Sequence, residues 1–194
     1  MPTPLAQGAP ADRSCGDCNL CCKVMVIKSL AKPAGSWCPH AVKGGCGVHG
    51  SHPDDCRSFR CRWLYDRALD EAWRPNRAKF VVSISTSGRR TSINLDASQP
   101  LAWRRGPYYE QIKLWSRAAW TGQGQVLLYL GDSVTAVFPE EELQIGVVGP
   151  DEQAGFAYRF TETTRQPCAS ILAPDGSERE FLGRQWPRGK DGGP

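Results

Sequence analysis

The sequence predicts an α+β fold in which a cysteine-rich, metal-organised N-terminal lobe packs on a mainly antiparallel sheet with two or three helices. Two observations predict it. Eight of the nine cysteines lie between Cys15 and Cys61, in a stretch with many glycines and little apolar periodicity. Beyond that stretch, short β-branched runs alternate with turn residues, and each β connection that can be identified is a hairpin.

Four segments are expected along the chain. Residues 1–14 hold three prolines and no hydrophobic stretch, which predicts a disordered leader without a secretory signal. Residues 15–75 form the cysteine-cluster metal-binding region, and residues 76–182 form the α+β body. The Gly/Pro-rich residues 183–194 are expected to be a disordered tail.

Periodicity and turn residues predict the elements of the body. One short helix is expected over Trp63–Trp73, before Pro75, and a second from Pro107 to Gly122. Glu140–Glu142 is expected to be a solvated turn or helix start. The expected strands cover 80–86, 91–95, 125–130, 133–138, 155–160, 168–172 and 179–182.

The clustered cysteines predict a metal centre. Thiolate is the soft ligand that zinc and iron–sulfur clusters prefer, and Cys-x2-Cys lets two sulfurs reach one metal. A disulfide framework would need a secreted chain, whereas the lack of a signal sequence favours a cytoplasmic protein with reduced thiols. The candidate metal ligands are Cys15, Cys18, Cys21, Cys22, Cys38, Cys46, Cys56 and Cys61.

Which cysteines share a centre stays open at this point. Cys15 with Cys18, and Cys18 with Cys21, are both possible knuckles, and Cys18 and Cys22 have helical i, i+4 spacing. Adjacent side chains diverge, so Cys21 and Cys22 are not expected to bind one small tetrahedral ion together. Three arrangements remain: two four-thiolate centres, one cluster with one zinc, or one centre with the other cysteines packed as reduced core residues.

The cofactor is either zinc or an iron–sulfur cluster. No second Cys-x2-Cys knuckle follows Cys22, which favours an iron–sulfur cluster in at least one site. The opening motif would contribute Cys15, Cys18 and Cys22 to that cluster. The remaining ligand would be Cys61, Cys56, Cys46 or Cys38.

Three stretches carry a resemblance to a known family. They are the opening Cys-x2-Cys-x2-Cys-Cys motif, residues 37–40 (Trp-Cys-Pro-His) and residues 46–61, which together fill all eight cysteine positions. The pattern resembles the YkgJ-type cysteine-cluster family, described as zinc- or iron-chelating, although His52 stands where that family usually has arginine. The resemblance covers about the first third of the chain and implies a ligand set more than a reaction.

Two alternative functions stay open. A distantly similar cysteine motif in iron–sulfur flagellin lysine N-methylases implies a protein-modifying enzyme, whose substrate pocket would involve Arg104, Arg105, Tyr108 and Tyr109. No hydrolase, metalloprotease or phosphate-loop motif identifies a catalytic site. A zinc-stabilised nucleic-acid-binding module would expose Arg57, Arg60, Arg62 and Trp63.

Charge and hydropathy restrict the classes of binding partner that we expect. The net charge of +4 is mostly explained by cations that offset anionic thiolates, which disfavours nucleic acid as a partner. No stretch approaches the ~18 apolar residues of a membrane span. A protein partner and the oligomeric state stay open. The three histidines, His40, His49 and His52, are expected to be loop residues or outer hydrogen-bond donors to sulfur, and Cys168 a core residue.

Overall fold

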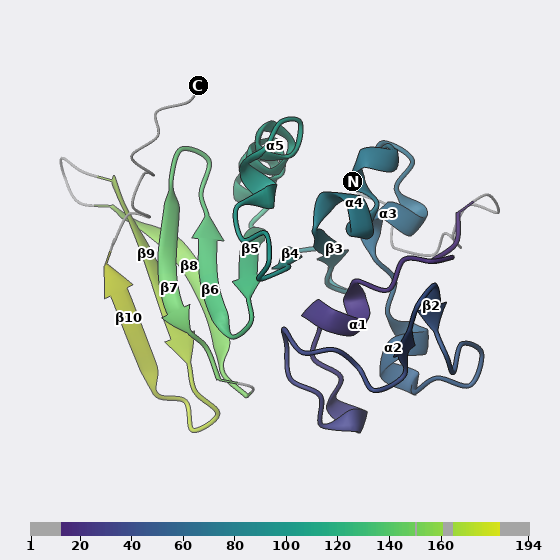
Figure 1. Cartoon of the computed structure of the whole chain (residues 1–194). Helices are drawn as coiled ribbons and strands as arrows, with labels where there is room; N and C mark the ends of the chain where they lie inside the picture. Colours follow the sequence, from purple (N-terminus) through teal and green to yellow (C-terminus); the bar gives the residue numbers. More distant parts are fainter. Residues whose placement is uncertain (1–12, 150, 161–164, 183–194) are drawn as a thin grey trace.

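The structure is a computed structural model that describes residues 13–149, 151–160 and 165–182. Within these residues the fold is mixed α/β, with three sheets whose strand pairs are mostly antiparallel, as expected. Most of the expected leader and the whole expected tail, residues 183–194, lie outside the described residues. The cysteine-containing segment lies at one end of the molecule beside β3 of the five-stranded sheet, and the three-stranded sheet lies toward the other end (Figure 1).

The N-terminal half is built from short elements. Pro75 and the glycines interrupt the chain too often for long helices, and the polypeptide turns every few residues. The elements here are α1 Cys21–Val24, η1 Lys28–Leu30, β1 Ala41–Val42, β2 Gly45–Cys46, α2 Asp54–Ser58, α3 Arg62–Tyr65, η2 Glu71–Trp73 and α4 Pro75–Ala78.

A five-stranded sheet forms the centre of the body, with strand order β3-β4-β5-β6-β7. The expected hairpins β3–β4 and β5–β6 are confirmed. The expectation that only hairpins occur is wrong for β4 and β5, which are parallel because the chain crosses through η3 and α5 between them. The bounds are β3 Phe80–Ile84, β4 Arg90–Leu95, η3 Ala102–Arg104, α5 Tyr108–Thr121, β5 Gln125–Leu130, β6 Ser133–Val137 and β7 Glu142–Val147.

A separate three-stranded sheet contains the expected C-terminal strands. Its order is β10-β9-β8, and both pairings are antiparallel. The strands are β8 Gln153–Phe160, β9 Arg165–Leu172 and β10 Glu178–Leu182. This sheet lies beside β6 and β7 (Figure 1), and the chain just before β8 reaches the cysteine segment, where Asp151 lies 3.8 Å from Lys28.

Two apolar clusters cover the two faces of the five-stranded sheet. Successive side chains of a strand point to opposite faces, so Val126 and Leu128 belong to one cluster while Leu127 belongs to the other. The cluster around Leu127 packs the central sheet on the three-stranded sheet. The cluster around Val126 includes Leu20 and Trp63, so the N-terminal half shares a core with the body.

Five short or medium α-helices occur in the described part of the chain, instead of the two or three expected. The helix expected over Trp63–Trp73 is broken after Tyr65. Asp66 and Asp70 explain the break, since each carboxylate accepts a hydrogen bond from the backbone N–H two residues later, at 3.0 and 2.9 Å. None of the helices of the described residues is long and apolar enough to cross a membrane.

The expectation that Glu140–Glu142 form a solvated turn or helix start is wrong for Glu142, which is neither solvated nor in a turn. It begins β7, and its side chain is 10% exposed. Lys113 of α5 contacts it at 2.6 Å and also donates to the carbonyl oxygens of Phe138 and Glu141, at 2.9 and 3.2 Å. Arg104 contacts the other carboxylate oxygen at 3.1 Å. This buried ion pair attaches α5 to β7.

Replacing Lys113 by methionine tests the ion pair. We expect the free energy of unfolding to fall by about 3 kcal/mol, because Glu142 and two carbonyl groups lose their buried donor. The matched control is Arg117→Ala on the same helix, whose pair with Glu140 is exposed and 3.7 Å long; it should cost less than about 1 kcal/mol. Urea denaturation measures both, and equal costs would contradict this account.

Candidate metal centre

All eight clustered cysteines line a single cavity of about 160 Å³. All nine cysteines of the chain are free thiols. Cys38 and Cys61 are buried and Cys15 is exposed, while the other five of the cluster are half-buried. Cys168 lies on β9, as expected for a strand residue, where its thiol donates to the carbonyl oxygen of Ala157 at 3.4 Å instead of lying in the core.

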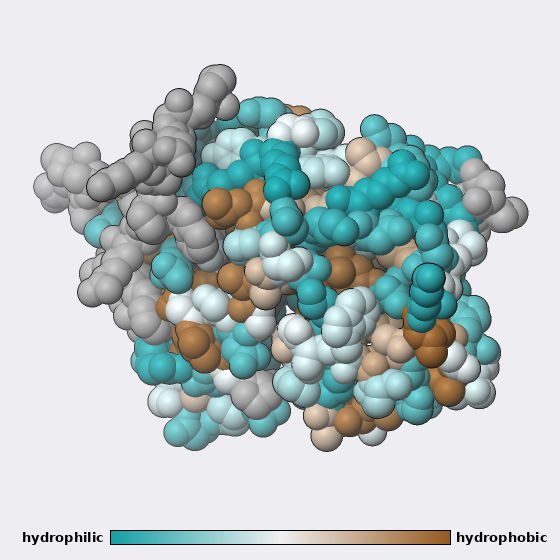
Figure 2. Space-filling view, viewed as in Figure 1, coloured by the Kyte–Doolittle hydropathy of each residue, from teal (hydrophilic) through white to brown (hydrophobic). Residues whose placement is uncertain are grey.

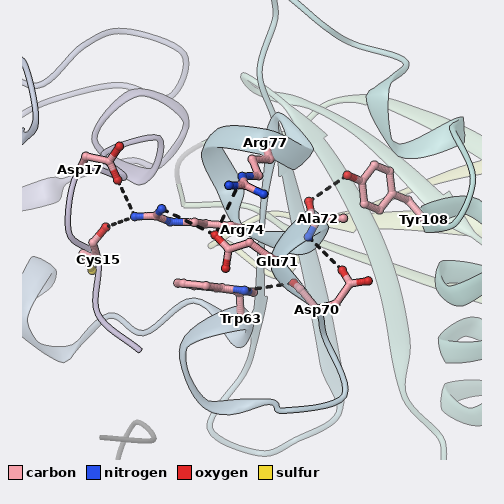
Figure 3. A network of polar contacts seen from close by, with 9 residues as sticks. All are labelled: Cys15, Asp17, Trp63, Asp70, Glu71, Ala72, Arg74, Arg77 and Tyr108. Atoms are coloured by element: carbon pink, nitrogen blue, oxygen red, sulfur yellow. Dashed lines mark hydrogen bonds and ion pairs between the residues drawn. The ribbon is translucent and has the colours of Figure 1, made fainter. Parts of the chain in front are cut away.

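The first two cysteines lie in a turn that Arg74 holds (Figure 3). The backbone N–H of Cys18 donates to the carbonyl oxygen of Cys15 at 2.8 Å. Gly16 has φ +52°, and a β-carbon there would approach the Arg74 guanidinium to 3.2 Å, so glycine suits both the turn and the contact. Arg74 Nη2 donates to the Cys15 carbonyl at 3.1 Å and to the Asp17 carboxylate at 2.5 Å.

Helix α1 carries Cys21 and Cys22, and its buried neighbours orient them. Leu20 and Val24, which flank the pair, are 6% and 3% exposed and belong to the shared core. Cys21 packs against that core. The carbonyl oxygen of Cys22 accepts from the backbone N–H of Cys38 at 2.9 Å, which brings the next loop to this helix.

The loop after Cys38 returns to the cavity through a small hairpin. The backbone N–H of Ala41 donates to the Cys38 carbonyl at 3.0 Å, and Ala41 pairs with Cys46 across β1 and β2. A β-carbon at Gly45 would lie 3.1 Å from the carbonyl oxygen of Gly16. Glycine therefore lets the hairpin lie against the turn that holds the first cysteines.

The last two cysteines flank the short loop between α2 and α3. Cys56 lies on α2, where Asp55 accepts from the backbone N–H of Ser29 at 2.9 Å. Cys61 precedes α3, and its carbonyl oxygen accepts from the N–H of Leu64 at 3.0 Å. Trp63 follows it, is 6% exposed and also lines the cavity.

Burial keeps several of these thiols protonated in the metal-free chain. Burial raises the pKa of Cys15 and Cys56 and raises that of Cys61 to about 11. A hydrogen bond from the Cys21 thiol lowers the pKa of Cys22 to about 7, and the same bond raises the pKa of Cys21. Thiolates bind metals, so metal binding here would displace protons.

Cations lie next to the sulfurs. Lys32 is 5% exposed, and its amino group donates to the carbonyl oxygens of Lys23, at 2.8 Å, and Met25. Burial lowers the pKa of Lys32, while the neighbouring cysteine thiolates raise it. Arg74 and Arg60 lower the pKa of Cys15 against the effect of burial. Sequence reasoning missed Arg74, which lies far from the cysteine motifs along the chain.

The sulfurs share a cavity without standing at metal-ligand spacing. Across the described residues, no group of three or more Cys, His, Asp or Glu side chains is arranged to hold a metal ion. The donor set fits zinc or an iron–sulfur cluster in chemistry, because every cysteine could supply a thiolate ligand and cations lie nearby. The distances between the sulfurs do not fit such a centre. Side chains would have to move before four sulfurs could bind one metal centre.

The three histidines also line the cavity. The rings of His49 and His52 stack with their centres 5.2 Å apart. His52 Nδ1 accepts from the backbone N–H of Gly50 at 3.1 Å. The expectation that these histidines are loop residues or outer hydrogen-bond donors to sulfur stays a prediction.

Residues nominated for the two alternative functions have structural contacts. Tyr108 donates to the carbonyl oxygen of Ala72 at 2.9 Å, and Tyr109 donates to Glu142 at 3.1 Å. Neither they nor Arg104 and Arg105 are among the residues that line the cavity. Arg62 pairs with Asp66 and Trp63 is buried, so these two do not contribute to an exposed basic and aromatic face, whereas Arg57 is exposed and pairs with Asp54. The remaining nominee, Arg60, is exposed.

Removing the Arg74 side chain tests how the first turn is held. Arg74→Ala should lower the free energy of unfolding by about 1 to 2 kcal/mol, mostly through the lost bond to the Cys15 carbonyl. Hydrogen exchange of the Cys18 amide should speed up. Arg77→Ala is the control, since Arg77 is 61% exposed and lies 3.9 Å from Glu71. Unchanged exchange at Cys18 in Arg74→Ala would contradict the assignment.

Comparison with known proteins gives no relative: no family model, no curated protein and no solved structure matches this chain. The similarity to the YkgJ-type family therefore stays a resemblance in the spacing of the cysteines.

Proposed function

We propose that this protein binds a metal through its clustered cysteines, as an iron–sulfur or zinc centre. The observation that carries the proposal is that the eight cysteines of the cluster line one cavity as free thiols, although they come from five separate stretches of chain. Cys168, outside the cluster, lies on β9. Eight free thiols around one cavity form a set of soft donors of the kind that zinc and iron–sulfur clusters prefer.

The surroundings of the cavity support an anionic centre. A tetrahedral zinc held by four thiolates carries a net charge of about −2, which nearby cations must offset in an apolar environment. Lys32 is buried against the cysteines, and Arg60 and Arg74 act on Cys15. The apolar side chains of Ile27 and Val81 line the same cavity and reduce its contact with water.

Apolar side chains are also exposed close to the cavity. Val26, Trp37 and Val42 are 51%, 53% and 50% exposed. Figure 2 shows hydrophobic surface over the part of the molecule where α1, α2 and β2 lie in Figure 1. Such surface around a thiolate site is suited to a protein partner more than to a nucleic acid, which requires cations on the outer face.

Metal and acid-labile sulfide analysis of anaerobically purified protein tests the proposal. Wild-type protein should contain bound metal, with a brown colour and sulfide if the centre is iron–sulfur, or zinc without sulfide otherwise. Cys18→Ser should lose at least half of the metal. Cys168→Ser should keep all of it, because Cys168 lies on β9.

The proposal fails if metal-free wild-type protein is obtained anaerobically and binds neither added zinc nor iron supplied together with sulfide. It also fails if Cys18→Ser and Cys168→Ser hold the same amount of metal as the wild type.

A further inference from the structure

We propose that residues 13–18 form a movable wall of the cysteine cavity, held closed by Arg13 and Arg74, and that its release exposes the buried Cys61 thiol. We call residues 13–18 the strap. This inference goes beyond the proposed function, because it concerns how any ligand or reagent reaches the cavity. It does not depend on which ligand the cavity binds.

The strap is a wall of the cavity with little structure of its own. Cys15, Gly16 and Cys18 line the cavity, although residues 14–17 are exposed. None of the described helices and strands includes the strap. In the described part of the chain, its backbone N–H groups make a single hydrogen bond, from Cys18 to the carbonyl oxygen of Cys15. Segments with so few backbone bonds and buried contacts open at the lowest cost in free energy.

The strap is fixed at its C-terminal end, where the chain enters the shared core. Asn19 Nδ2 donates to the carbonyl oxygens of Val42 and Gly45, at 3.1 and 3.4 Å. Leu20 is 6% exposed and belongs to the same apolar cluster as Trp63. Movement of the strap about Asn19 would therefore leave helix α1 and the β1–β2 hairpin in place.

Arg13 holds the other end of the strap against the chain that follows Cys61. Its Nη1 donates to the carbonyl oxygens of Trp63 and Asp66, at 2.7 and 2.9 Å, and its Nη2 donates to that of Leu69 at 2.8 Å. The guanidinium carbon also lies 5.1 Å from the centre of the Trp63 ring. One side chain thus supplies three charge-assisted hydrogen bonds and a cation–π contact.

Arg74 holds the middle of the strap against the same tryptophan (Figure 3). It donates to the Cys15 carbonyl and the Asp17 carboxylate, and its guanidinium carbon lies 5.5 Å from the centre of the Trp63 ring. Trp63 itself lines the cavity. Both arginines therefore fix the strap through side-chain contacts around Trp63, and these contacts can break without the loss of a helix or strand.

Cys61 is the buried thiol that the strap covers. It lies two residues before Trp63, in the stretch of chain that both arginines contact. Burial raises the pKa of Cys61, and the charges of Cys15 and Cys18 raise it further, so the strap thiols lie close to it. Opening of the strap should therefore admit water and small reagents to Cys61.

Cys38 is a built-in control, because it is equally buried and held by other contacts. Cys61 and Cys38 are 8% and 7% exposed. The backbone N–H of Cys38 donates to the Cys22 carbonyl at 2.9 Å, and its carbonyl oxygen accepts from Ala41 at 3.0 Å. None of these partners belongs to the strap. Opening of the strap should expose Cys61 alone, whereas unfolding of the whole chain exposes both thiols.

Thiol labelling of the full-length chain tests the strap. Protein is kept anaerobic with excess chelator, so that no metal protects the thiols, and receives short pulses of N-ethylmaleimide. Peptide mass spectrometry then gives the labelling rate of each cysteine. In Arg13→Ala the rate at Cys61 should rise about tenfold, because the strap loses three bonds from a charged group, and the rate at Cys38 should change less than about twofold.

Three further variants sharpen the test. Arg13→Lys should raise the rate at Cys61 less than Arg13→Ala does, because an ammonium group keeps part of the bonding to the carbonyl oxygens. Arg74→Ala should also raise the rate at Cys61, because it releases the middle of the strap. Arg77→Ala is the matched control, since Arg77 is 61% exposed and makes no printed contact with the strap, and it should change neither rate.

Two results would overturn the inference. One is an unchanged labelling rate at Cys61 in Arg13→Ala. The other is equal acceleration at Cys61 and Cys38 in both Arg13→Ala and Arg13→Lys, as unfolding of the whole chain would cause. A preferential rise at Cys61 in either variant supports the strap. None of these results bears on metal binding, which is measured separately in protein without chelator.

Discussion

Packing of Leu20, Val24 and Trp63 into the core that they share with strand β3 fixes where the cysteines lie. These residues flank Cys21, Cys22 and Cys61 in the sequence, so burying them sets the direction of the neighbouring thiols. The core side chain Val81 of β3 itself lines the cavity. A segment with few regular hydrogen bonds is thereby placed by apolar contacts with a sheet, and its cysteines line one cavity.

Under the proposed function, metal binding would be coupled to the protonation of the cysteines. Burial raises the pKa of Cys15, Cys56 and Cys61, whereas the hydrogen bond from Cys21 lowers the pKa of Cys22 to about 7. A divalent ion would convert these thiols to thiolates, and Lys32, Arg60 and Arg74 would offset the resulting charge. In the described residues the sulfurs are not spaced to hold a metal ion, so the proposed centre would require side chains to move.

Much of the fold could be predicted from local sequence, and the failures have physical causes. The hairpins β3–β4 and β5–β6 follow from β-branched runs around turn residues, and α5 follows from its apolar spacing. The helix expected over 63–73 fails because Asp66 and Asp70 bind their own backbone, which favours turns. Strand β7 was not predicted, because a run of glutamates at its start indicates a solvated segment. The buried partner of Glu142 is Lys113, which is distant in the sequence. At the site, the clustering of cysteines in the sequence identified all eight residues of this type that line the cavity, but Arg74 was missed because it lies far from them along the chain.

X-ray absorption spectroscopy of the bound metal tests the central claim, that these cysteines form a thiolate metal site. For wild-type protein we predict a first shell of four sulfurs per metal, at ~2.3 Å if the metal is zinc. The iron edge would add a short iron–iron distance if the centre is a cluster. A first shell of nitrogen and oxygen atoms, as surface histidine or carboxylate binding would give, would contradict the account.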